Sequence, residues 1–99
     1  MSLDEFYREL AKQAKKFKVS PILGEIRHKI CERCPISMVG QEKVGVSYWN
    51  QQYLTCGQAI GLSRSDIIKI VQAADNQVFN KEVADVRKKM LHVLNLEEI

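Results

Sequence analysis

The sequence contains no apolar run that approaches the roughly 20 residues needed to span a bilayer. Its first ten residues, MSLDEFYREL, are polar and acidic, whereas a secretory signal is cationic and then apolar. It also lacks repeats, low-complexity tracts and linkers rich in glycine, serine or proline. We therefore expect a cytoplasmic protein without a membrane segment, folded as one domain over residues 1–99.

Cysteine is scarce, and its odd number argues against a disulfide framework. The chain has three cysteines, Cys31, Cys34 and Cys56, whereas small disulfide-bonded domains normally pair an even number. What the chain does have is 45% hydrophobic and 27% charged residues, enough for an ordinary core. Its net charge of +3 is mild and permits a nucleic-acid partner without requiring one.

Apolar residues recur at steps of three and four, and no segment shows sustained two-residue alternation. The predicted class is therefore all-α: a compact single-domain bundle of about five helices with a helix-turn-helix-like central pair. The first helix begins at Ser2, and Glu5 completes a capping box. Its predicted buried face consists of Leu3, Phe6, Leu10, Ala14 and Phe17.

A second helix is predicted to begin at Ser20-Pro21, because serine caps helices and proline fits the first helical position. Cys34-Pro35 would end this helix and start a short one over Pro35–Gln41. The predicted buried face of the second helix consists of Ile22, Ile26 and Ile30.

The segment from Val44 to Ser63 has no charged residue, which predicts a largely buried central helix. This helix would be capped by Ser47 and would end at Ile60. Its predicted inward residues are Trp49, Tyr53, Cys56 and Ile60.

The ends of two further helices are marked by local signals. Gly61 supplies a left-handed residue that closes the central helix, and Ser63 with Asp66 offers a capping box for the next. A last helix is predicted after Asn80. The two buried faces consist of Ile67, Ile70, Val71 and Ala74 in the first helix and Val83, Val86, Met90 and Leu94 in the second.

Residues Tyr53 to Gln72, about a fifth of the chain, resemble the helix-turn-helix unit of bacterial repressors. Gly57 stands where the two helices touch and Gly61 at the turn, with Cys56, Ile60, Leu62, Ile67 and Ile70 as apolar positions. The resemblance implies duplex DNA as a partner, with serines on phosphates and an arginine or glutamine on base edges. The implied DNA-binding residues are Ser63, Arg64, Ser65, Lys69 and Gln72.

The same helices also fit a module in which they only pack the core and the partner is a protein or a second copy. Ile68 falls on the face that would meet the DNA groove, and Asp66 would repel phosphate. The charges that share a face with Arg64 and Lys69 discriminate between the two hypotheses. Basic neighbours from Lys12, Lys15 or Arg87 to Lys89 favour DNA, and acidic ones from Asp66, Asp75 and Asp85 disfavour it.

Metal binding and catalysis have weaker sequence support. A zinc site would need His28, Cys31, Cys34 and Cys56 to converge, and a second CxxC pair is missing; buried thiols explain the cysteines equally. Neither His28 nor His92 stands in a pattern that names a mechanism, and no glycine-rich phosphate loop is present. We therefore expect no enzyme activity and no cofactor.

A wider similarity concerns the motifs CPIS, LTCGQAIGLSRSDIIKIVQAADN and RKKMLHVLNL, which together span about two thirds of the chain. These resemble small all-helical proteins of bacterial and phage genomes, a group to which we attach no activity. The resemblance implies an all-helical fold and an accessory or regulatory role.

Overall fold

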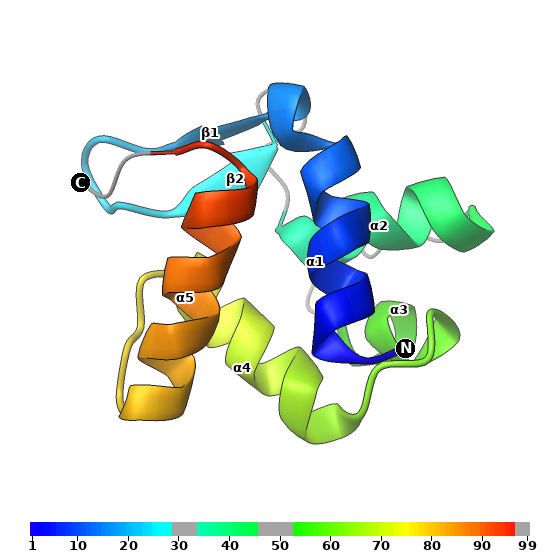
Figure 1. Ribbon diagram of the computed structural model, residues 1–99. Helices are drawn as coiled ribbons and strands as arrows, with labels where there is room; N and C mark the ends of the chain where they lie inside the picture. The colour runs from blue at the N-terminus through cyan, green and yellow to red at the C-terminus, as the bar shows by residue number, and fades with distance from the viewer. Residues whose placement is uncertain (29–33, 46–52, 97–99) are drawn as a thin grey trace.

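A computed structural model describes residues 1–28, 34–45 and 53–96, and this part of the chain forms five α-helices and one small hairpin around a shared core (Figure 1). The predicted mainly helical class is confirmed. No helix among the described residues has the length and apolar character to cross a membrane. The helices are α1 (Leu3–Lys12), α2 (Pro35–Val44), α3 (Tyr53–Ala59), α4 (Arg64–Ala74) and α5 (Lys81–Val93).

The predicted helix at Ser20-Pro21 is wrong, because this region forms a β-hairpin. Strands β1 (Phe17–Val19) and β2 (Ile26–His28) pair antiparallel, with Val19 opposite Ile26. A hydrogen bond of 2.8 Å from the Ser20 amide to the Glu25 carbonyl closes the turn, and Gly24 within it has a positive φ of 67°. Each strand has only three residues, too few for their alternation to be recognised in the sequence.

The hairpin changes the burial predicted for this region. Ile26 is buried as expected, but Ile22 lies in the turn and is 89% exposed. Ile30 lies outside the described residues. Phe17 is buried as predicted, but it belongs to strand β1 and not to the first helix. That helix ends at Lys12 and is followed by a short 3₁₀ helix, Ala14–Lys16.

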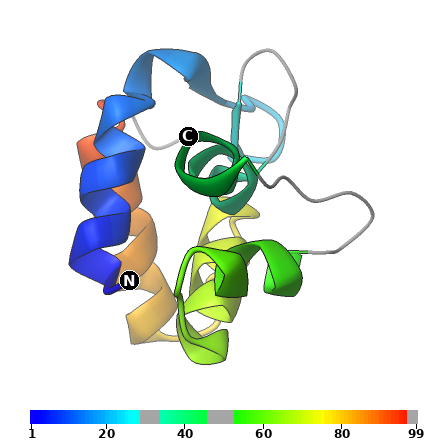
Figure 2. The ribbon, with the colours of Figure 1, turned by 90° about the vertical axis from the view of Figure 1, so that its right-hand side faces the viewer.

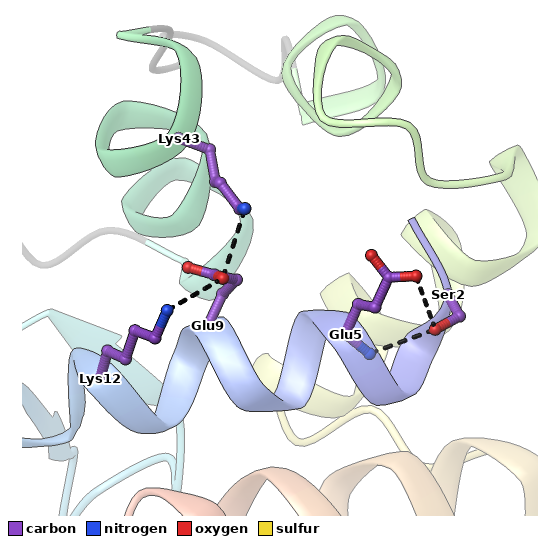
Figure 3. A network of polar contacts seen from close by, with 5 residues as sticks. All are labelled: Ser2, Glu5, Glu9, Lys12 and Lys43. Atoms are coloured by element: carbon purple, nitrogen blue, oxygen red, sulfur yellow. Dashed lines mark hydrogen bonds and ion pairs between the residues drawn. The ribbon is translucent and has the colours of Figure 1, made fainter.

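Helix α1 begins as predicted and is tied to α2 by one carboxylate. The Ser2 hydroxyl accepts a hydrogen bond from the Glu5 amide at 3.2 Å (Figure 3). Glu9 pairs with Lys12 at 3.2 Å and with Lys43 of α2 at 3.3 Å (Figure 3). Burial acts to raise the Glu9 pKa, but hydrogen bonds from the two lysines outweigh it and lower this pKa below its usual value.

Helices α2 and α3 agree in part with their predicted bounds. Helix α2 begins at Pro35 as expected but continues to Val44, where Gly45 ends it with a φ of 69°. The central helix is described from Tyr53 to Ala59, and the predicted cap Ser47 and the residues up to 52 lie outside the described part of the chain. The predicted inward residues Cys56 and Ile60 are buried.

Helices α4 and α5 begin where they are predicted to begin, after Ser63 and after Asn80. The Ser63 hydroxyl accepts from the Asp66 amide at 3.1 Å, and the Asn80 side-chain oxygen accepts from the Val83 amide at 2.9 Å. Val71 is half-buried. The remaining predicted core residues of these two helices are all buried: Ile67, Ile70, Ala74, Val83, Val86, Met90 and Leu94.

The contact between α3 and α4 depends on Gly57, as its position in the sequence predicted. A Cβ at position 57 would lie 2.5 Å from Ile67 Cγ1 and 2.6 Å from Ile67 Cδ1, both closer than carbon atoms pack. Gly61 follows with a φ of 87°, which allows the sharp turn between the helices. The chain therefore brings α3 and α4 together through two glycines.

We expect Gly57→Ala to destabilise the fold by about 1 kcal/mol. Overpacking a buried contact costs about 1–3 kcal/mol and exceeds the gain of roughly 1 kcal/mol in helix propensity. Urea denaturation measures the change. In an Ile67→Ala background the clash is relieved, so the same substitution should be neutral or stabilising there; an equal cost in both backgrounds would contradict the contact.

Candidate functional site

The residues predicted to meet DNA do not lie on one continuous basic face. Ser63, Arg64 and Ser65 are exposed at the start of α4, and Gln72 is half-buried further along. Lys69 is also half-buried, and its Nζ lies 3.1 Å from Glu82 Oε2 of α5. The structure thus places Arg64 and the serines at one end of the helix and directs Lys69 toward α5.

The surroundings of Lys69 are of mixed charge. A cavity of about 290 Å³ places it beside the carboxylates of Asp4, Glu82 and Asp85 and the amine of Lys89. Arg87, proposed in the sequence as a basic neighbour, is buried and 2% exposed. These mixed neighbours of Lys69 give less support to DNA binding than a basic face would.

The outward side of α4 is partly apolar. Ile68 and Val71 line a cavity of about 370 Å³, completed by polar side chains that include Gln72 and Asp75, and by Tyr53 of α3. Burial raises the Asp75 pKa, and the positive charge of Arg27 opposes this shift. An apolar residue, Ile68, therefore lies on the side of α4 that would have to meet DNA, as the sequence indicated.

The three candidate zinc ligands that the structure describes, His28, Cys34 and Cys56, do not form a metal site. Cys31 lies outside the described residues, and no group of three metal-ligating side chains occurs among the others. His28 is buried and packs edge-on against Phe17, with the two ring centres 5.8 Å apart, and Cys34 occupies the N-cap position of α2. Cys56 is buried, its thiol donates to the Ile36 carbonyl at 3.6 Å, and burial raises its pKa, which disfavours the thiolate that zinc binds.

A buried arginine that the sequence analysis missed joins three parts of the chain. Arg87 Nη1 donates to the Ala73 carbonyl in the last turn of α4 at 2.9 Å. Its Nη2 donates to the Gly24 carbonyl in the hairpin turn at 2.7 Å. The side chain of Asn76 adds a third link by donating to the Leu23 carbonyl at 3.1 Å. In the sequence, Arg87 opens the basic run RKK and resembles a surface residue.

Four large apolar side chains are exposed on the two loops that these bonds connect. They belong to the hairpin turn and to the segment between α4 and α5, which lie on the same side of the molecule (Figure 1). We call them the loop patch: Ile22 (89% exposed), Leu23 (54%), Val78 (42%) and Phe79 (72%). No periodic signal marks these residues, because each stands in a loop.

Comparison with known proteins finds no match: no family model, no curated protein and no solved structure is significantly similar to this chain.

We expect Arg87→Lys to destabilise the protein by about 2–3 kcal/mol, because one ammonium group cannot reach both carbonyls in the fork geometry of a guanidinium. Denaturant unfolding measures the loss. Lys88→Ala, an exposed change at the next position, is the control and should stay within about 0.5 kcal/mol of the parent. Similar stability for the two variants would contradict a structural role for Arg87.

Proposed function

We propose that this protein is a non-enzymatic binding module that holds a protein partner on the loop patch. The observation that carries the proposal is the exposure of Ile22 and Phe79 on neighbouring loops. Single exposed apolar residues are common on protein surfaces, whereas an apolar patch more often marks an interaction site. These four side chains stand on two loops that are hydrogen-bonded to each other and lie on the same side of the molecule. Aromatic side chains such as Phe79 are frequent anchors of protein interfaces.

The energetics favour a partner for these side chains. Burying one large apolar side chain fully contributes about 1.5–3 kcal/mol, so Ile22 and Phe79 together offer several kcal/mol to a complex. The patch alone is smaller than the roughly 800 Å² that each partner contributes to a stable interface. A partner would therefore also contact polar residues around the patch, or bind transiently.

The loops are held in place before any partner arrives. Arg87 and Asn76 bond to carbonyls of the hairpin turn, and Arg87 also bonds to the end of α4. Loops that are already ordered lose less conformational entropy on binding than mobile ones. The buried arginine therefore supports binding without contacting the partner.

The double variant Ile22→Ser, Phe79→Ser tests the patch, because it replaces the two most exposed side chains and leaves the core unchanged. Val44→Ser is the matched control, since Val44 is 49% exposed at the end of α2 and outside the patch. We expect a protein captured by the parent and by the control to be lost by the double variant. Once that protein is purified, its Kd should rise at least about tenfold with the double variant only. Equal binding by all three would refute the proposal.

DNA binding through α3 and α4 is the second candidate. The close contact at Gly57 and the turn at Gly61 support it, because a helix-turn-helix requires both. Ser63, Arg64 and Ser65 are exposed at the start of α4, where backbone amides favour phosphate. Against it stand the partly apolar outer side of α4 and the pairing of Lys69 with Glu82.

Fluorescence anisotropy with random duplex DNA at several salt concentrations tests this candidate. If it holds, binding weakens steeply with salt, and Arg64→Ala with Lys69→Ala lowers the affinity and the salt slope. Arg8→Ala with Lys15→Ala removes the same charge from α1 and from the 3₁₀ helix that follows it, where both residues are exposed, and should have a smaller effect. Absence of binding at low salt, or equal loss in the two variants, would rule out reading by α4.

A further inference from the structure

A groove runs between α1 and α5. The two helices pack side by side in the same direction (Figures 1 and 2). Besides the cavity beside Lys69, a second one of about 540 Å³ lies along this pair. Both are lined by Tyr7, Asp85 and Lys89, so the two cavities adjoin, and together we call them the α1–α5 groove.

The charge of this groove changes sign along its length. Where the two helices begin, Asp4 and Glu82 line it. Of the two lysines in that cavity, Lys69 is paired with Glu82, and Lys89 lines the second cavity as well. Further along, Lys88 and His92 line it. Parallel helices produce such a gradient because acidic residues are favoured at helix starts and basic residues at helix ends.

The middle of the groove contains a tyrosine that stays protonated. Tyr7 is 7% exposed, and Lys89 Nζ lies 5.9 Å from the centre of its ring. Burial and the negative charges of Asp4, Asp66 and Asp85 raise the pKa of Tyr7 to about 12. With Val93 beside it, the groove offers an uncharged centre between an acidic end and a basic end.

We propose that the α1–α5 groove is a self-association surface that binds the same groove of a second copy of this chain. A two-fold axis perpendicular to the groove places the acidic end of each copy on the basic end of the other. The parallel arrangement would instead set like charges together. The charge pattern therefore favours one occupant and one orientation, and the proposal does not depend on the loop patch.

Sedimentation velocity over a range of protein concentrations tests the proposal with two charge-reversed variants. One is Lys88→Glu with Lys89→Glu, which makes the whole groove acidic, and the other is Asp4→Lys with Asp85→Lys, which makes it basic. We expect the parent to dimerise and each variant alone to raise the dimer Kd at least about tenfold. A mixture of the two variants should form a heterodimer, because acidic and basic grooves then face each other at both contacts.

Lys15→Glu with Lys81→Glu is the charge-matched control, since both residues are exposed and neither lines the groove. This control should dimerise more tightly than Lys88→Glu with Lys89→Glu. Recovery in the mixture cannot result from misfolding, and circular dichroism checks each variant separately. A parent that stays monomeric at every concentration would overturn the proposal, and so would a mixture that does not associate. The proposal would also be overturned if the double variant Ile22→Ser, Phe79→Ser lost the dimer while the charge-reversed groove variants kept it, because the contact would then lie on the loop patch.

Discussion

The arrangement of the hairpin, α4 and α5 depends on the hydrogen bonds of one buried side chain, the guanidinium of Arg87. It extends from α5 to the carbonyls of Ala73 and Gly24, and so joins the end of α4 to the hairpin turn. Burying a cation costs several kcal/mol unless its donors are satisfied, and the last carbonyls of a helix carry partial negative charge. The end of α4 is therefore a favourable partner for it. Without this side chain, two buried carbonyls would lose a charged donor, and the hairpin turn would lose its hydrogen bond to α5.

The same link explains how a small chain displays apolar side chains without losing its fold. The hairpin turn is held through its Leu23 and Gly24 carbonyls, and the Asn76 side chain joins the segment after α4 to it. Ile22 and Phe79 therefore need not pack inward to keep the loops in place. Charged residues on the helices show a different pattern, in which Glu9, Glu42 and Glu82 bind lysines of other elements. The loop patch and the α1–α5 groove thus differ in kind: one is apolar and displayed by loops, and the other is polar at its ends and built from two helices.

Local signals predicted the helices well where the signal and its partner lie within four residues of each other. Ser2, Ser63 and Asn80 cap their helices because each accepts from an amide three residues ahead, a bond that needs no other part of the chain. The same reasoning failed at Ser20-Pro21, since serine followed by proline suits a turn as well as a helix start. The choice was made by Gly24 at positive φ and by the pairing of Val19 with Ile26.

Residue order by itself determined the mainly helical class, most helix starts and the buried stripes of α4 and α5, because these follow from spacing along one helix. It also determined the α3–α4 contact, since only glycine at position 57 leaves room for Ile67. The tertiary structure alone decided that Arg87 is buried, that Lys69 pairs with Glu82, and that Ile22 and Phe79 face outward. Each of these depends on which distant segment lies alongside, so the same residue types in the same local pattern would be compatible with the opposite outcome.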